Sequence, residues 1–185
     1  NYIWRGSNIG TGPSIQPDLS MTADSSLTIG VWGAFDFSGY SEADLYVVYE
    51  FPFGLSLGAT DYYYPGTSYF DYSEVSGNHA FEANLSYEIK GFSISGNYIF
   101  NKAGGALSSG ADKYFELGYD FKKIKVFVGA GDGWHTSDSD FAVCNIGLET
   151  SKEIKITESF TVPVTGAVIL NPEKEYFNVV VGFTF

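Results

Sequence analysis

The sequence predicts an all-β fold: an antiparallel up-and-down transmembrane β-barrel of about twelve strands, in one domain over residues 1–185. Three observations predict it. Apolar residues recur at every second position, most of the predicted strands have about ten residues, and the connections alternate between long and short. A tilted strand that crosses a bilayer needs about 9 to 11 residues, whereas strands of soluble proteins usually have about 5 or 6.

The alternation is clearest at residues 81–89, where Phe81, Leu85 and Ile89 fall on one face and acidic or polar residues on the other. No segment repeats with the helical period of 3.6. With turn residues as boundaries, the predicted strands cover residues 1–6, 13–23, 26–37, 42–51, 54–64, 79–89, 92–102, 112–121, 124–132, 140–150, 156–170 and 176–185.

The connections between these strands differ in length from one end of the predicted barrel to the other. The long, polar set covers residues 7–12, 38–41, 65–78, 103–111, 133–139 and 171–175. The short set covers residues 24–25, 52–53, 90–91, 122–123 and the looser 151–155. An outer-membrane barrel has short periplasmic turns and longer extracellular loops, which predicts this asymmetry.

Aromatic residues cluster near both predicted strand ends, as in the interfacial girdles of membrane barrels. The inner group is Tyr49, Phe51, Phe53, Tyr87, Phe92, Tyr119, Phe121, Phe183 and Phe185, and the outer group is Trp4, Phe35, Phe37, Tyr62, Tyr64, Phe100, Trp134 and Phe141. A soluble β-sandwich also alternates, but it accounts for neither the girdles nor the loop asymmetry.

The composition excludes several classes of protein. Aromatic residues make up 18% of the chain and charged residues 17%, against about 25% charged in ordinary soluble domains. A hydrophobic fraction of 44% excludes disorder. The net charge of −12 argues against a nucleic-acid partner, which needs clusters of basic residues. The single cysteine, Cys144, excludes an internal disulfide, and no motif predicts a metal or other cofactor.

The last predicted strand places Phe177, Val179, Val181, Phe183 and the terminal Phe185 on one face. This pattern resembles the C-terminal recognition strand of Gram-negative outer-membrane proteins. The resemblance implies an assembly signal that the barrel-assembly machinery reads, and a location in the bacterial outer membrane in contact with lipid and lipopolysaccharide.

The N-terminal forty residues carry a second resemblance. Tyr2-Ile3-Trp4-Arg5-Gly6 is followed by Pro17-Asp18-Leu19 and then by Gly30-Val31-Trp32-Gly33. This succession resembles the opening of the TorF-like porin family of Gram-negative outer-membrane β-barrel proteins. It implies a barrel classed as a porin by its shape. Because Asn1 falls inside the first predicted strand, we expect further residues upstream of it.

If the apolar alternates face lipid, the opposite face lines the lumen. On that parity the predicted lumen and pore-lining residues are Arg5, Asp18, Asp36, Glu42, Asp44, Glu50, Glu82, Glu88, Glu116, Asp120, Lys125 and Glu149. Carboxylates that outnumber basic groups attract cations and repel anions. The sequence therefore predicts a small porin with an acidic, cation-preferring lumen for small solutes, in which Arg5 pairs with Asp18 or Glu42.

Two alternatives stay open at the level of sequence. A twelve-stranded lumen lies between filled and open barrels, so the chain could be a non-conducting accessory or scaffold subunit that binds other outer-membrane proteins. A lipid hydrolase would use His135 with Ser137 near the external rim. The aromatic loop from Tyr62 to Tyr72 could cover the mouth, or contact a partner or a sugar.

Overall fold

Strands make up 61% of the chain in a computed structural model, far above the 20–25% of ordinary domains, and confirm the all-β prediction. The structure describes residues 1–66 and 68–185. The elements are β1 (Tyr2–Trp4), β2 (Ser7–Ile9), β3 (Ser14–Ile15), β4 (Asp18–Ala23), β5 (Leu27–Asp36), β6 (Ser41–Glu50), β7 (Leu55–Tyr63), β8 (His79–Ile89), β9 (Phe92–Ile99), β10 (Asp112–Asp120), β11 (Lys125–Gly131), the 3₁₀ turn η1 (Gly133–His135), β12 (Ala142–Lys155), β13 (Thr161–Asn171) and β14 (Tyr176–Phe183).

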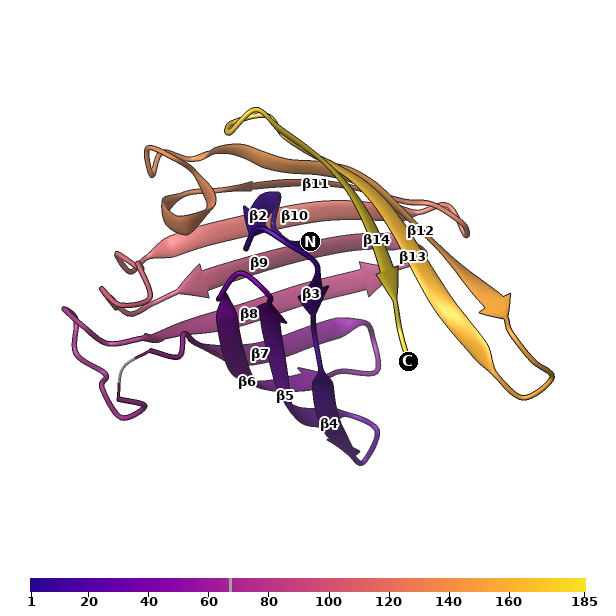
Figure 1. Ribbon diagram of the computed structural model, residues 1–185, viewed down its shortest axis with the longest axis horizontal. Helices are drawn as coiled ribbons and strands as arrows, with labels where there is room; N and C mark the ends of the chain where they lie inside the picture. Colours follow the sequence, from indigo (N-terminus) through magenta and orange to yellow (C-terminus); the bar gives the residue numbers. More distant parts are fainter. Residues whose placement is uncertain (67) are drawn as a thin grey trace.

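Twelve of these strands form one antiparallel sheet in which each strand from β5 to β14 pairs with its neighbours in the chain. The strands lie side by side, with the long connections gathered at one end and the tight turns at the other (Figure 1). The longest connections join β7 to β8 and β9 to β10, whereas β8 and β9 are joined by two residues, Lys90 and Gly91. The predicted asymmetry of the connections is therefore confirmed.

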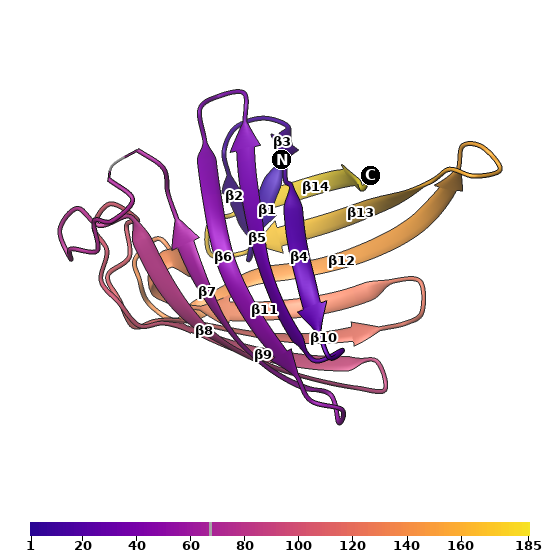
Figure 2. The same ribbon diagram turned by 90° about the horizontal axis from the view of Figure 1, so that it is seen from below.

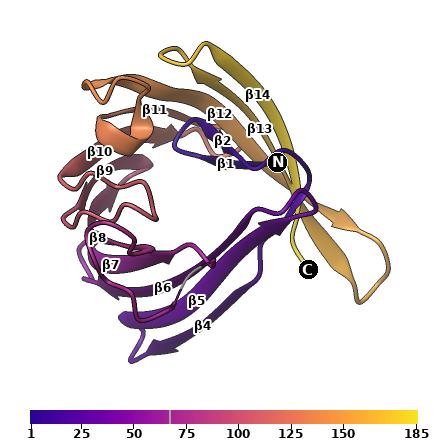
Figure 3. The ribbon, with the colours of Figure 1, turned by 60° about the vertical axis from the view of Figure 1, so that its left-hand side comes forward.

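The first predicted strand, residues 1–6, is not part of this sheet. Tyr2–Trp4 pairs instead with Ser7–Ile9 in a separate two-stranded hairpin, so part of the predicted loop 7–12 is also a strand. The connecting residues Arg5 and Gly6 both have positive φ angles, 49° and 84°, as a two-residue type I′ hairpin turn requires. The large sheet curls around this hairpin (Figure 3).

Two further boundaries differ from the prediction. The second predicted strand, 13–23, is divided into β3 and β4, which pair with opposite halves of β5. Gln16 and Pro17 separate them, because proline donates no ladder hydrogen bond. The turn predicted at 151–155 is wrong: β12 continues to Lys155, and the chain turns at 156–160, where the Ile156 amide donates to the Phe160 carbonyl.

The sheet is curled, with a convex and a concave face (Figure 2). The two faces differ in chemistry. Along β6, Leu45 and Val47 are exposed on the convex face, while Glu42 and Asp44 are buried on the concave face. In β14 the residues of the predicted assembly signal, Phe177, Val179, Val181 and Phe183, are likewise exposed, as is Phe185 just beyond the strand. The predicted parity of the strands is therefore confirmed where these residues lie.

The sheet does not close into a barrel. Its path ends at β14 on one side and at β3 and β4 on the other, and in the described part of the chain these two edges are not paired with each other. The shown architecture is thus a twelve-stranded up-and-down sheet. Across the described residues, the structure has no helix of the length and apolarity needed to cross a membrane.

Candidate functional site

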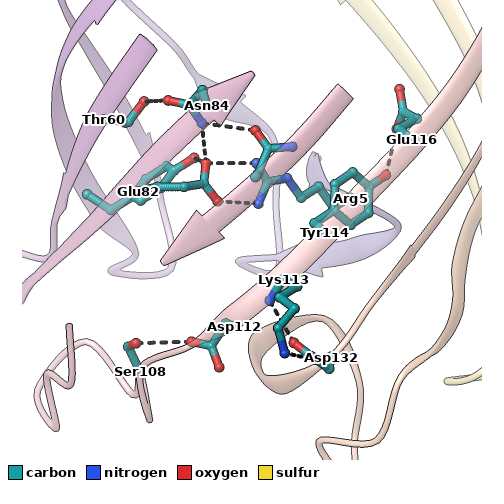
Figure 4. Close-up of polar contacts among 12 residues, drawn as sticks. Arg5, Thr60, Glu82, Asn84, Ser108, Asp112, Lys113, Tyr114, Glu116 and Asp132 are labelled. Carbon is teal, nitrogen blue, oxygen red and sulfur yellow. Dashed lines mark hydrogen bonds and ion pairs between the residues drawn. The ribbon is translucent and has the colours of Figure 1, made fainter. Parts of the chain in front are cut away.

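The concave face carries a network of buried polar groups around the N-terminal hairpin (Figure 4). Glu82 of β8 and Tyr114 of β10 point to this face. Successive side chains of a strand point to opposite faces, and the residues on either side of Glu82 and of Tyr114 are more exposed, on the convex face. The hairpin enters from the concave side and places Arg5, at its turn, between these two strands. Elements distant in sequence therefore converge on one arginine.

Arg5 and Glu82 form a bidentate ion pair, with Nη1 donating to Oε1 at 2.6 Å and Nη2 to Oε2 at 2.8 Å. The Arg5 side chain is 13% exposed and that of Glu82 1%. Two parallel charge-assisted hydrogen bonds fix orientation as well as distance. The predicted partner of Arg5 was wrong: it binds neither Asp18 nor Glu42.

Glu82 also accepts hydrogen bonds from its own sheet. The Tyr62 hydroxyl donates to Oε2 at 2.9 Å, and Nδ2 of Asn84 donates to the same oxygen at 2.6 Å. Thr60 then donates to Oδ1 of Asn84 at 2.9 Å. A buried carboxylate with this many donors is compensated without any solvent contact.

Aromatic rings enclose the guanidinium of Arg5. Its central carbon lies 4.5 Å from the Trp4 ring centroid and 4.6 Å from that of Tyr114, so the cation is held between two π faces. The Tyr114 hydroxyl donates to Glu116 at 2.6 Å, and Nδ2 of Asn145 donates to the Tyr114 oxygen at 2.8 Å. The predicted lumen residues Arg5, Glu82 and Glu116 thus belong to one network.

Two further acidic residues, Glu42 and Asp44, lie on β6. The hydroxyls of Tyr40 and Tyr64 donate to the two oxygens of Glu42, at 2.7 Å and 3.0 Å. Asp44, two residues further along the strand, is buried, and its Oδ1 has no hydrogen-bond partner among the described residues. Both carboxyl groups are buried, and neither has a basic partner in the described ion pairs.

The remaining predicted lumen residues lie outside these two groups. Glu88, Asp120 and Lys125 line a cavity of about 360 Å³ at the tight-turn end. Glu50 and Glu149 are exposed. At the other end, Asp36 accepts the backbone amides of Thr11, Ser38 and Tyr40 and serves as a turn cap. Asp18 accepts the Tyr46 hydroxyl at 3.1 Å.

His135 and Ser137, the pair that would serve a hydrolase, have different surroundings. The His135 ring is 1% exposed and packs 5.0 Å from Trp4 and 5.1 Å from Tyr114. Both of its ring nitrogens are unpartnered among the described residues, and burial lowers the pKa of the imidazole to about 3. The Ser137 hydroxyl and amide donate to Glu173 instead.

Sequence reasoning missed the roles of three groups. Tyr114 is recognisable only as an inward position. Tyr62 is predicted in the outer aromatic girdle, and this prediction is wrong, because Tyr62 is buried on the concave face against Trp4 and Trp134. Nothing in the sequence pairs either tyrosine with Arg5. The third is His79, whose Nδ1 lies 2.9 Å from Asp61 and whose Nε2 lies 2.6 Å from the carbonyl oxygen of Tyr69. These contacts hold part of the aromatic loop against the sheet. Thr67 in that loop lies outside the described residues.

No known family model matches the chain, and neither does any curated protein or solved structure.

Proposed function

We propose that this protein is an integral outer-membrane β-barrel that forms a narrow, cation-preferring pore for small solutes, with the β1–β2 hairpin obstructing its lumen. The single observation that carries the proposal is the division of the sheet into an exposed apolar convex face and an acidic concave face. Lipid would contact the first face and water the second, as in outer-membrane barrels.

The surface area supports a membrane environment. The chain exposes 11174 Å², whereas a folded soluble monomer of 20.2 kDa exposes about 8,800 Å². Much of the exposed surface is apolar, and it includes Leu19, Met21, Leu85 and Leu117 on the convex face. A soluble protein rarely exposes continuous apolar patches above a few hundred Å². A lipid-facing surface explains this exposure, whereas a soluble sandwich does not.

The charges of the concave face support cation preference. Glu50, Glu88 and Asp120 are exposed at the tight-turn end, and none of the three has a basic partner in the described ion pairs. A low-dielectric wall around such carboxylates concentrates the field and raises the local cation concentration. Outer-membrane lipid, lipopolysaccharide and the barrel-assembly machinery are the partners that this proposal implies.

A second candidate is a non-conducting barrel that acts as an accessory or scaffold subunit of an outer-membrane complex. The observation that favours it is the packing around the hairpin: the rings of Trp4, Tyr62 and Trp134 lie within 6.1 Å of one another. Buried Arg5 and Glu82 complete this packing. Such packing would block ions as long as the hairpin stays in place.

Single-channel recording in planar bilayers under a KCl gradient tests both candidates. We expect the native protein to conduct weakly with a reversal potential that indicates cation preference. Arg5→Ala removes the side chain that anchors the hairpin and should raise the conductance. The matched control is Lys113→Ala, which also removes one positive charge, but from an exposed ion pair with Asp132.

The recordings separate the candidates. Anion preference in the native protein contradicts the proposed pore, because the lumen carboxylates would then not govern permeation. No conductance in either the native protein or Arg5→Ala favours the accessory barrel. Lys113→Ala should behave as the native protein does.

A further inference from the structure

The two free edges of the sheet run in the same direction. β5 to β14 supply ten successive positions, and β3 with β4 supplies one more beside β5, which makes eleven. Both β4 and β14 run from the end with long connections towards the end with tight turns (Figures 1 and 3). An odd number of antiparallel strands necessarily leaves two parallel edges.

Such a pair of edges forms a slot for one additional strand. A strand that runs from the tight-turn end to the long-connection end would be antiparallel to both edges, and it would satisfy the backbone groups that each edge leaves unpaired. A second copy of this chain in the same membrane orientation cannot supply it, because both of its edge strands would run parallel, and not antiparallel, to the edges of the slot.

We propose that the N-terminal segment, residues 1–5, is the strand that this slot accepts, and that it exchanges between the concave hairpin and the wall of the barrel. The inference rests on the proposed membrane barrel. The segment is joined to β3 by residues 6–13, so from the slot it would enter the wall as the neighbour of β3 and in the required direction.

The hairpin already lies at the inner side of the slot. Asn1, Tyr2 and Ile3 line a cavity of about 190 Å³ together with Gln16, beside β4, and Val180 of β14. These two residues belong to the two edges that the segment would join. For residues 1–3 the exchange therefore needs only a short displacement through the gap between β3/β4 and β14, which we call the seam. Trp4 and Arg5 have further to move, because they cross the concave space from their contacts with Tyr62, Glu82 and Tyr114.

The side-chain pattern of the segment suits the wall. Antiparallel pairing that keeps residues 6–13 as the loop places Trp4 opposite Ile15 and Arg5 opposite Ser14. Ser14 pairs with Asp36 and Ile15 with Phe35 in the present sheet, and Ile15 and Phe35 are exposed on the convex face. Tyr2 and Trp4 would thus face lipid at the outer rim, where aromatic residues are favoured, and Arg5 would stay on the concave side.

The two positions of the segment exclude each other. In the hairpin, Arg5 binds Glu82, the rings fill the concave face and the seam stays open. In the wall, the segment pairs with both edges and leaves the lumen clear. In this register residues 1–5 lie opposite residues 14–18, so opening of the pore and closure of the part of the seam beside β3 are one event. Weakening the Arg5 to Glu82 contact shifts the population towards the wall position.

Oxidative cross-linking in intact outer membranes tests the exchange. In a Cys144→Ala background, Trp4→Cys with Ile15→Cys reports the wall position, because in the hairpin the sheet separates these two side chains. We expect a minor cross-linked fraction that rises at least severalfold when Glu82→Gln is added. The matched control, Trp4→Cys with Leu19→Cys, places the second cysteine four residues out of register on the same exposed convex face.

A second pair, Tyr2→Cys with Pro17→Cys, repeats the test without removing Trp4. Heat-modifiable migration on gels verifies that each variant folds in the membrane. The proposal is overturned if neither in-register pair cross-links, with or without Glu82→Gln. It is also overturned if the control pair cross-links to the same extent, or if cross-linking is already complete before Glu82 is changed. Conductance is recorded separately. A barrel that cross-links but does not conduct contradicts the proposed pore function, whereas the proposed exchange of the N-terminal segment still stands.

Discussion

At the scale of single residues, the buried charge of Arg5 depends on one carboxylate. Breaking a buried ion pair by removing one partner leaves an uncompensated charge, which costs about 3–5 kcal/mol, whereas removing both charges can be nearly neutral. Arg5→Met keeps much of the aliphatic volume between Trp4 and Tyr114 and leaves Glu82 without its bidentate donor. The pair is therefore suited to a double-mutant cycle.

We expect Arg5→Met to lower the free energy of unfolding by about 3 kcal/mol, and Glu82→Gln to lower it by a similar amount. The double variant should recover at least half of the summed loss, because neither charge remains buried. Urea unfolding in detergent, followed by tryptophan fluorescence, measures all three variants. Additive losses would contradict a direct coupling of the two side chains.

His135 gives the fold a sensitivity to acid. The pKa of its buried ring, about 3, lies below the ordinary value of 6.5, so the unfolded chain binds a proton more readily than the folded chain. The contribution of the neutral ring to the free energy of unfolding is therefore fully present above about pH 6.5 and is lost as the pH falls towards 3.

His135→Phe removes this titration while it keeps a ring between Trp4 and Tyr114. Between pH 7.5 and pH 4.5 we expect the native protein to lose roughly 2 to 3 kcal/mol more stability than the variant. Thermal unfolding of both proteins at the two pH values measures the difference. Parallel losses would show that His135 does not carry the acid sensitivity.

At the scale of strands, glycines on the concave face make room for tyrosine rings. A Cβ built at Gly30 would overlap the ring of Tyr46, and one built at Gly129 would overlap the hydroxyl of Tyr114. These rings lie across neighbouring strands, so the absence of a side chain at glycine lets a bulky residue lie flat on the sheet.

Gly129→Ala should therefore push Tyr114 away from Arg5 and destabilise the fold by about 1–3 kcal/mol. The control is Gly12→Ala, because a Cβ at Gly12 meets no atom within 4 Å, and its effect should stay within about 0.5 kcal/mol. Denaturant midpoints of the two variants provide the comparison. Equal midpoints would mean that displacing Tyr114 does not lower the free energy of unfolding.

The strands of the wall were predictable because their alternation is set by two contrasting faces. Residues 79–89 form a strand with the predicted bounds. The N-terminal segment also alternates, and period 2 does not distinguish a wall strand from a separate hairpin. What distinguishes the hairpin is the pair of positive φ angles at Arg5 and Gly6. The contact of Arg5 with Glu82 joins residues 77 positions apart and is not part of any strand pairing, so alternation does not predict it.

At the scale of the whole molecule, the net charge of −12 is unevenly distributed. Basic residues such as Lys90, Lys122 and Lys123 lie in the tight turns, whereas Glu50, Glu88 and Asp120 lie nearby at the same ends of β6, β8 and β10. The acids at this end are accessible to water and are not paired with lysine in the described ion pairs. They would form the acidic entrance of the proposed pore.

Neutralising this entrance with Glu50→Gln, Glu88→Gln and Asp120→Asn should lower the cation-over-anion permeability ratio severalfold, because the field at the entrance sets the local ion concentrations. The measurement is the reversal potential under a KCl gradient, made in the Arg5→Ala background so that current is large enough. Raising both solutions towards 1 M KCl should narrow the difference, since the Debye length falls to about 3 Å. Glu74→Gln, Asp138→Asn and Asp140→Asn, which remove the same charge from exposed residues in the long connections at the opposite end, should leave the ratio unchanged. If both triple variants have the native ratio, selectivity does not arise from these carboxylates.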